Sequence, residues 1–293
     1  MRYTVIVITR DRRDALLRTL GTLRAQPDRP TVIVVDNDSS DGTADAVAGA
    51  FPDVIVLRAR SNLGAVARNV AVDHVLTPYA AFCDDDTWWD PGAFDRAADL
   101  LDAHPRLAVV TGRVIAEPGG REDPVVAELR DSPLPSPEWL DRPVIGSFLA
   151  GASMVRVEAF RAAGGFSARL WLGGEEELLS ADLMSMGWYL CYAEEAVVHH
   201  EASPVRDADL RRRHGIRNTL WFTWLRRPAR SAARRTGWLL RTVPRDRISA
   251  LAFAEAVAGL PWVLRHRAVV PPHVEEHLRA LELSNRRSRN YVS

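Results

Sequence analysis

The segment YAAFCDDDTWWDP, residues 79–91, places three consecutive carboxylates, Asp84, Asp85 and Asp86, directly after a run of apolar residues. The apolar run has the composition of a buried strand. Adjacent acids repel one another, so a fold that gathers them at the end of a strand usually supplies positive charge, most simply from a divalent cation. A cation at this point would attract a phosphate. The alternative is an ordinary loop whose aspartates cap a helix that begins near Pro91.

Strands and helices alternate along the residues that precede this segment. Apolar runs at 4–9, 31–35 and 54–57 predict strands, and apolar residues recur at helical spacing between the first two runs and across 65–75. This order predicts an α/β fold with a Rossmann-type, mostly parallel sheet and helices on both faces. Ligands of such sheets bind beyond the carboxyl ends of the strands, where the polar loops of this region fall.

Two of these loops carry candidate ligand-binding residues. The sequence DNDSSDGT, residues 36–43, has the composition of ordinary turns and helix caps, or else Asp36 accepts hydrogen bonds from a nucleobase or a ribose. The sequence NLGAVARN, residues 62–69, has Gly64 where a backbone can approach a ligand closely. Arg68, in the first turns of the next helix, either serves a diphosphate or forms an exposed salt bridge.

These segments together resemble the family 2 glycosyltransferases, which share the GT-A fold. The resemblance rests on four motifs in the order of the family and at about its intervals: residues 4–12, 36–43, 62–69 and 84–86. It continues through residues 164–166 and 172–178 to residues 196–200, and so covers roughly residues 3–202. The resemblance implies a GT-A-like catalytic domain.

The resemblance also implies a site for a nucleotide-diphosphate sugar. Thr9 and Asp36 would hold the base and the ribose, and Asp86, the last acid of a DxD-like triplet, would bind Mg²⁺ or Mn²⁺ between the two phosphates. The residues assigned to the donor are Thr9, Arg10, Asp36, Asn62, Arg68, Asp84 and Asp85. The family often has an aromatic residue where this chain has Arg10, which leaves uracil and thymine open as the base.

Glu175, Glu176 and Glu177 follow a Gly-Gly turn and open a helical run. The helix dipole favours acids at this position, so capping is one interpretation. Displacing a nucleoside diphosphate from an anomeric carbon also requires a carboxylate that takes a proton from the acceptor hydroxyl. The resemblance implies that Glu176 is this base, with Glu175 and Glu177 as substitutes because the register can slip by one residue. Trp171, just upstream, is either an aromatic that stacks on the acceptor or a core residue.

His199 and His200 end an apolar run, residues 193–198, that has strand character. Adjacent side chains of a strand point to opposite faces, so at most one of the two histidines reaches a metal. A histidine in such a place is otherwise an ordinary packed or exposed residue. The family commonly has a metal-binding histidine here, and the resemblance assigns His199 to the metal, with His200 as the alternative.

The charge of the chain divides near residue 205. Residues 1–205 hold 19 basic and 31 acidic side chains, whereas residues 206–293 hold 19 and 7. We expect residues 1–205 to form the catalytic domain, with a nucleotide-binding half over about 1–115 and an acceptor-binding half over about 116–205. Residues 206–293 are expected to be an Arg-rich helical extension that packs on the acidic body or meets an anionic surface.

Prolines at positions 228, 244 and 261 are expected to break this extension into several helices. Residues 248–264 contain a single charged side chain, Glu255, but a proline and a glycine near one end disfavour a helix that spans a membrane. Two interpretations remain open. The helices form a cap over the acceptor site, or they make peripheral contact with a membrane surface.

The composition is that of a folded protein in a reducing compartment. A chain of 293 residues with 47% hydrophobic content can bury a full core. Cys83 and Cys191 lie in apolar runs without CxxC spacing, which indicates core thiols and no structural zinc. The first strand begins at Tyr3 without a secretory leader, so we expect the cytoplasm, with a peripheral position at the inner membrane face as an option. No nucleic-acid partner is expected, and an oligomer is left open.

The sequence therefore predicts a metal-dependent, inverting glycosyltransferase that moves a sugar from a UDP- or dTDP-sugar to a hydroxyl of a glycan, a lipid-linked acceptor or a small molecule. One alternative is a nucleotidyltransferase, which would usually show a glycine-rich phosphate loop that residues 9–14 lack. The other is a catalytically silent protein, either a sugar-nucleotide binder or a membrane adaptor, which would tolerate the loss of Glu176.

Overall fold

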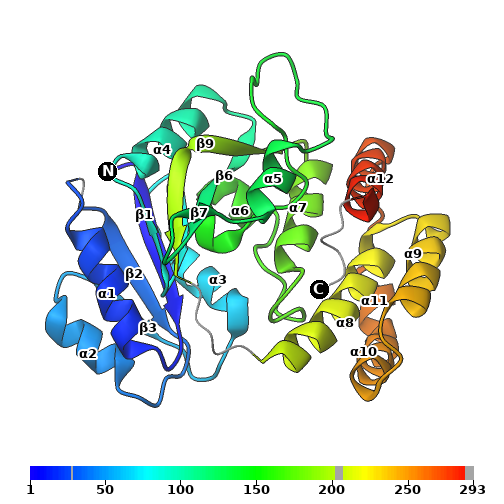
Figure 1. The fold of residues 1–293 in the computed structure, drawn as a ribbon, viewed down its shortest axis with the longest axis horizontal. Coiled ribbons are helices and arrows are strands. Elements are labelled where there is room, and N and C mark those ends of the chain that lie inside the picture. The colour runs from blue at the N-terminus through cyan, green and yellow to red at the C-terminus, as the bar shows by residue number, and fades with distance from the viewer. Residues whose placement is uncertain (28, 202–206, 288–293) are drawn as a thin grey trace.

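The computed structural model describes residues 1–27, 29–201 and 207–287, and these residues contain one nine-stranded sheet (Figure 1). The strands lie in the order β3-β2-β1-β4-β8-β6-β9-β5, and β7 pairs with β6. Their bounds are β1 Tyr3–Thr9, β2 Thr31–Asp36, β3 Ile55–Arg58, β4 Tyr79–Asp84, β5 Thr87–Trp89, β6 Leu107–Ala116, β7 Arg121–Glu122, β8 Ser153–Arg156 and β9 Tyr189–His200. The predicted Rossmann-type strands are confirmed, and the third begins one residue later than expected.

The first half of the sheet is parallel. β1 pairs with both β2 and β4, and β2 pairs with β3. The register sets Thr9 opposite Asp36 and Ile8 opposite Asp84, so the carboxyl ends of three neighbouring strands coincide. β1 and β4 are buried along almost their whole length, as expected of strands that are covered on both faces.

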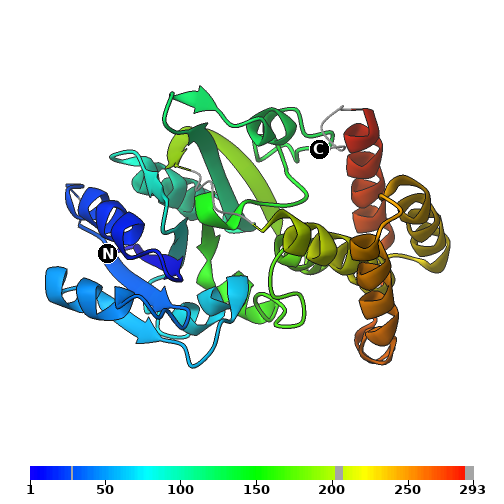
Figure 2. The ribbon, with the colours of Figure 1, turned by 60° about the horizontal axis from the view of Figure 1, so that its bottom comes forward.

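Helices connect these strands and cover both faces of the sheet (Figures 1 and 2). They are α1 Arg13–Arg24, α2 Thr43–Ala50, α3 Ala67–Val72, α4 Ala93–Ala103, α5 Val125–Arg130, α6 Val157–Ala162 and α7 Glu175–Ser185. The helix expected over residues 65–75 is shorter than predicted, because a 3-10 turn, Gly64–Val66, precedes α3.

The second half of the sheet is mixed and brings two distant segments together. β8 lies antiparallel to β4 and β6, and β9 runs parallel to β6. The short β5, which directly follows the acidic triplet, pairs antiparallel with β9 and sets Thr87 opposite His200. The end of β9 therefore lies beside the acids, although the two segments are far apart in the sequence.

The described part of the C-terminal extension is helical, as predicted. Its helices are α8 Ala208–Arg226, α9 Ala229–Thr242, α10 Arg247–Ala258, α11 Leu260–His266 and α12 Pro272–Arg287. Figures 1 and 2 both show α8 between the sheet and the other helices of the extension. The guanidinium of Arg226 donates to the carboxylate of Asp182 in α7 at 2.5 and 2.9 Å. The buried Arg227 pairs in the same way with Glu275 of α12.

The expected breaks at the three prolines are observed, since Pro228 precedes α9, Pro244 precedes α10 and Pro261 lies in the first turn of α11. The predicted domain boundary at residue 205 falls within 202–206, outside the described residues, and the division into domains stays a prediction. Within the described ranges, no single helix is long and apolar enough to cross a membrane. Only α10 and α11 together reach that length and hydropathy, with a bend of 50° between them.

Both cysteines lie in the core. Cys83 on β4 and Cys191 on β9 are buried and form no disulfide. Burial raises the pKa of each thiol to about 12, so neither is a ready nucleophile or metal ligand. The interpretation of both residues as core thiols is confirmed.

Candidate active site

The carboxyl ends of β1 and β4 border a cleft of about 690 Å³, which the first turns of α7 and α8 close on the other side. Most of the predicted site residues line it: Thr9, Arg10, Asn62, Arg68, Asp84, Asp85, Asp86, Trp171, Glu175, Glu176 and His200. Asp36, Glu177 and His199 do not. The sheet edge thus gathers the nucleotide, acid and base candidates in one place, as the strand order predicts.

Two arginines balance the acidic triplet. The buried guanidinium of Arg68 pairs with Asp84, so this arginine belongs to the site and is not an exposed salt-bridge residue. Arg12 lies between the other two acids, with its Nη1 atom 3.1 Å from Oδ1 of Asp85 and 3.0 Å from Oδ2 of Asp86. Side chains of the protein itself thus supply positive charge beside the adjacent acids.

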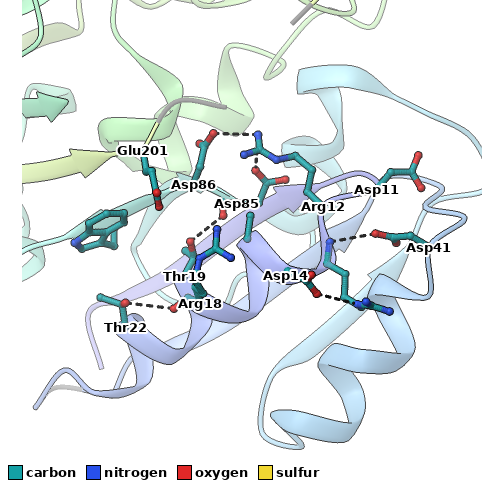
Figure 3. Close-up of a pocket in the computed structure, with 13 residues that line it drawn as sticks. Asp11, Arg12, Asp14, Arg18, Thr19, Thr22, Asp41, Asp85, Asp86 and Glu201 are labelled. Atoms are coloured by element: carbon teal, nitrogen blue, oxygen red, sulfur yellow. Dashed lines mark hydrogen bonds and ion pairs between the residues drawn. The ribbon is translucent and has the colours of Figure 1, made fainter. Parts of the chain in front are cut away.

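Arg12 lies at the border between the cleft and a second hollow of about 620 Å³ on the α1 side of the acids (Figure 3). Asp85 also accepts a 2.9 Å hydrogen bond from the Thr9 hydroxyl, and the Thr19 hydroxyl donates to its backbone oxygen at 2.8 Å. Burial raises the pKa of Asp85 to about 7, although Arg12 and Thr9 both favour the charged form. Sequence reasoning missed Arg12, since a basic residue after a strand is a common feature of exposed loops.

The register of β5 and β9 places the two histidines on opposite faces of β9. The Nε2 atom of His200 lies 3.7 Å from Oδ1 of Asp86, inside the cleft. His199 points to the opposite face of β9, where its ring nitrogens lie 2.9 Å from Asp90 and 3.0 Å from Glu117. His199 therefore does not line the cleft, and its assignment to the metal stays a prediction. The alternative, His200, is the histidine beside the acids.

Asp86 and His200 are the donors that a divalent cation would find in the cleft. The described ranges, 1–27, 29–201 and 207–287, contain no group of three or more His, Cys, Asp or Glu side chains that could hold a metal. A carboxylate and an imidazole nevertheless suit Mg²⁺ or Mn²⁺, because Mg²⁺ is usually bound by one or two carboxylates together with water and substrate phosphates, and imidazole is a usual ligand of transition metals. The donor set fits a cation that enters with a diphosphate.

The loop after β2 supports the cleft through a residue that sequence reasoning did not single out. The side chain of Asn37 accepts a 2.7 Å hydrogen bond from the backbone N–H of Leu63 and donates to the carbonyl of Gly64 at 3.0 Å. Asn37 lines the cleft and fixes the loop that follows β3. Asp36, the residue before Asn37, is buried, and its carboxylate accepts a 3.0 Å hydrogen bond from the N–H of Ser39. Its assignment to a ribose stays a prediction.

The three glutamates at the start of α7 point in different directions, because successive helical residues are rotated by about 100°. Glu175 is buried, and its Oε2 atom has no hydrogen-bond partner among the described residues. Glu176 lines the cleft. Glu177 lines a separate cavity together with Arg227 and Arg235. Glu177 therefore lies away from the other candidates, and its role as a substitute base stays a prediction.

Burial raises the pKa of Glu176 to about 8, and the neighbouring negative charge of Glu175 adds to the rise. Burial raises the pKa of Glu175 as well. The positive charge of Arg68 opposes both shifts, whereas the carboxylate of Asp84 raises the pKa of Glu176 further. A carboxyl group with a pKa near neutrality can take a proton from a substrate and release it again.

Trp171 joins the loop before α7 to the loop after β3. Its backbone adopts a left-handed conformation with a φ of 62°, and its carbonyl accepts a 2.9 Å hydrogen bond from the N–H of Ala65. Its indole N–H donates to the carbonyl of Asn62 at 3.1 Å. A Cβ atom at Gly64 would lie 2.3 Å from the Trp171 carbonyl, so only glycine permits this contact. Trp171 is a half-buried residue of the cleft lining and not a core residue.

A residue of the C-terminal extension also holds the loop that precedes α7. The buried side chain of Asn218 on α8 donates to the carbonyls of Leu170 at 2.9 Å, Leu172 at 3.1 Å and Gly173 at 2.5 Å. Arg217 adds a 3.2 Å hydrogen bond to the Leu170 carbonyl. The position of α7, and with it Glu176, therefore depends on α8. No local sequence pattern reveals a contact between residues so far apart in the chain.

Comparison with known proteins connects this geometry with one family. A family model described as glycosyl transferase family 2 matches residues 4–163. Among curated proteins, the chain is 28% identical over 235 residues to an N-acetylglucosaminyl-diphospho-decaprenol L-rhamnosyltransferase of Mycobacterium tuberculosis, a match that covers 68% of this chain and 76% of that protein.

Solved structures share the fold. A mannosyltransferase from Pyrobaculum calidifontis, in complex with GDP-Man and Mn²⁺, has a TM-score of 0.58 at 21% identity over 97% of this chain and 75% of that one. GalNAc-T7 with UDP, GalNAc and Mn²⁺ has a TM-score of 0.63 at 13% identity over 90% of this chain and 56% of that one. The expected GT-A-like fold is confirmed.

The raised pKa of Glu176 predicts an effect on stability. Between about pH 4.5 and 8 the folded protein binds this proton more tightly than the unfolded chain, so the wild type loses stability as the pH rises through that window. We expect Glu176→Gln to increase the free energy of unfolding at pH 8 by at least about 1 kcal/mol, and the gain to vanish near pH 4.5. Urea unfolding at both pH values measures this, with the exposed Glu138→Gln as control. A variant no more stable than wild type at pH 8 would contradict the assigned environment of Glu176.

Proposed function

The chain belongs to glycosyl transferase family 2, and from that membership we propose a metal-dependent, inverting transferase whose donor is a nucleotide-diphosphate sugar. One observation carries the proposal. Glu176, a glutamate with a raised pKa, faces the same cleft as the acidic triplet and its two arginines. The glutamate suits removal of a proton from an acceptor hydroxyl, and the charged cluster suits a diphosphate leaving group.

The donor would lie across the carboxyl ends of β1, β2 and β4. Arg12 and Arg68 would supply positive charge to the diphosphate, because guanidinium groups match phosphate oxygens in charge and geometry. Asp36 would accept a hydrogen bond from the ribose. Thr9 and Arg10 lie where the base would enter, and Arg10 is exposed at the position where the family often has an aromatic residue. UDP and dTDP are the two nucleotides that we propose.

Asp86 and His200 would hold Mg²⁺ or Mn²⁺. When bound, such a cation supplies positive charge to the departing diphosphate. The similar structures from the mannosyltransferase and GalNAc-T7 hold Mn²⁺, which supports metal use within this fold. Arg12 would exchange its contact with Asp86 for a phosphate oxygen, so that the guanidinium stays in the site with the donor.

Glu176 would accept the proton of the acceptor hydroxyl. The acceptor oxygen then bonds to the anomeric carbon from the face opposite the diphosphate, while the bond between that carbon and the diphosphate oxygen breaks and its electron pair leaves with the diphosphate. This single displacement inverts the configuration and needs no enzyme nucleophile. Glu175 is buried beside Glu176, and its charge keeps the pKa of the base high. Arg68 would stabilise the charge that develops on the leaving group.

The acceptor that we propose is a lipid-linked glycan. The Mycobacterium relative is named for the transfer of L-rhamnose to N-acetylglucosaminyl-diphospho-decaprenol, so this class of acceptor and this sugar are the first candidates for the present chain. Trp171 lines the cleft with Glu176 and would stack on a sugar ring of the acceptor. We propose the cytoplasm as the compartment in which the enzyme meets this acceptor.

The role of Glu176 distinguishes the proposed transferase from the alternative functions. The match to the glycosyltransferase family model and the absence of glycine from residues 9–14 remove the support for a nucleotidyltransferase. A silent sugar-nucleotide binder would have the same donor site but no need of a base in the cleft. Loss of turnover with retained nucleotide binding in a Glu176 variant identifies the enzyme.

We therefore expect Glu176→Gln to lower kcat by about 10²- to 10⁴-fold, the usual range for general acid–base catalysis, while nucleotide affinity stays close to that of wild type. In the wild type, kcat/KM should rise with pH through about 8 and level off above it, because Glu176 must lose its proton before it can accept another. Steady-state kinetics across that pH range test both points, with Glu138→Gln as control. Turnover near the wild-type level in Glu176→Gln would exclude this residue as the base.

The anchoring role of Asn218 predicts a selective loss of turnover. Asn218→Leu keeps a side chain of similar size but removes the N–H donors that hold the loop before α7. We expect kcat to fall about tenfold or more through misplacement of Glu176, with little change in nucleotide affinity. The control is Thr236→Val, which removes a hydrogen bond to Trp224 elsewhere in the extension. Equal kinetic effects in the two variants would indicate a general loss of stability and not a positioning role.

A further inference from the structure

The α10–α11 pair presents an apolar face to solvent. The exposed residues of α10 recur at three- and four-residue spacing, and all but the first are apolar: Arg247, Ala250, Leu251, Ala254, Val257 and Ala258. The face continues on α11 with Leu264, of which 70% is exposed, beside 56% for Val257 and 39% for Leu251. Large apolar side chains that gather on one side of a helix pair mark an interaction surface.

The opposite face of the pair is fixed against α8, so the exposed face cannot turn inward. Ala252 and Ala256 are fully buried, and the indole N–H of Trp221 on α8 donates to the carbonyl of Ala256 at 3.0 Å. A Cβ atom at Gly259 would lie within 2.6 Å of the Trp221 ring, which shows how closely the bend between α10 and α11 rests on α8. The pair (orange in Figure 2) therefore extends from α8 with one buried side and one free side.

The charges around this face are positive. Arg245 and Arg247 are exposed at the start of α10, and Arg265 is exposed at the end of α11. The acids of the same region are held on the other side by ion pairs within the extension. Glu255 pairs with Arg213 and Arg217, and Asp246 caps α10 and pairs with Arg212 at 2.7 Å. The apolar face is thus bordered by arginines that form no ion pair with any of the described residues.

We propose that this face binds the surface of an anionic phospholipid bilayer. Leu251, Val257 and Leu264 would enter the boundary between headgroups and acyl chains, and the bordering arginines would contact lipid phosphates. An apolar helix face flanked by cations lies in the plane of such an interface, and each arginine near an anionic membrane adds affinity. The bend of 50° between α10 and α11 and the arginines at both ends suit a pair that lies along the surface and does not cross it.

Charge favours this occupant over a second copy of the chain. A symmetric dimer through the same face would bring the arginines of one copy against those of the other, and like charges that face each other across an interface repel. An anionic bilayer offers acyl chains to the apolar side chains and phosphates to the arginines. An anionic bilayer also accounts for the excess of basic side chains in residues 206–293, which hold 19 basic and 7 acidic side chains. Acids of this segment such as Asp246, Glu255 and Glu275 form ion pairs within the protein.

The proposed membrane face is linked rigidly to the cleft. Glu255 of α10 pairs with Arg217 of α8, and Arg217 donates to the Leu170 carbonyl in the loop that precedes α7. Binding of α10 and α11 to a bilayer would therefore hold the acceptor side of the cleft at a fixed height above the lipid. The inference goes beyond the proposed glycosyl transfer and does not depend on it, since binding to lipid vesicles requires neither donor nor acceptor.

Co-sedimentation with vesicles tests the proposal on the full chain. We expect the wild type to sediment with phosphatidylcholine vesicles that contain phosphatidylglycerol, and not with pure phosphatidylcholine, and binding to weaken as salt rises. Arg245→Ala with Arg265→Ala should weaken binding about 30-fold, at about fivefold for each arginine. The matched control is Arg60→Ala with Arg121→Ala, two exposed arginines of the catalytic part, which should leave binding unchanged.

Leu251→Glu with Leu264→Glu should abolish vesicle binding, whereas Leu76→Glu, at a site in the catalytic part that is 99% exposed, should not. Circular dichroism confirms that each variant is folded. Two outcomes overturn the proposal: wild-type protein that fails to sediment with anionic vesicles, and a face-dependent dimer, seen by light scattering, that dissociates in the Leu251→Glu, Leu264→Glu variant. Protein that binds vesicles but transfers no sugar would count against the proposed glycosyltransferase function and would support the proposed membrane-binding face.

Discussion

The negative charge that the sheet gathers at one edge is the constraint on which the site depends. Parallel pairing of β1 with β2 and β4 makes three carboxyl ends coincide, and the chain places Asp84, Asp85 and Asp86 at that point. Acids this close in a half-buried cleft do not stay ionised without partners. Arg68 and Arg12 are such partners. A cation and a diphosphate would enter by exchange with these internal pairs.

The C-terminal extension contributes to the structure of the candidate site. Asn218 and Arg217 of α8 hold the loop that positions Glu176, and Arg226 pairs with Asp182 of α7. The charge division between the two parts of the chain thus has two consequences. Some arginines of the extension bind the acidic catalytic part, and others remain exposed beside the apolar face of α10 and α11.

Sequence patterns predicted the elements that depend on local order along the chain. Apolar runs predicted the strands. Because the carboxyl ends of parallel strands lie at one edge of the sheet, we expected candidate residues such as Arg68, Asp84 and Glu176 to lie close together. The family resemblance supplied their roles. The sequence left His199 and His200 as alternatives because which of them faces the acids depends on how β5 pairs with β9, and a shift of one residue reverses it. Arg12 and Asn218 were missed because their roles arise from contacts between segments that are distant in sequence.

Calorimetric titration with UDP, dTDP and GDP, each with Mn²⁺ and again with EDTA, tests the central claim that the acidic edge is a metal-assisted nucleotide site. We expect one of the uridine and thymidine nucleotides to bind with Mn²⁺, and to bind at least about tenfold more weakly with EDTA, in Asp86→Ala and in His200→Ala. His199→Ala, on the opposite face of β9, should bind as wild type does. Binding that is unchanged by EDTA would contradict this claim. Binding that is lost in His199→Ala and retained in His200→Ala would contradict it as well.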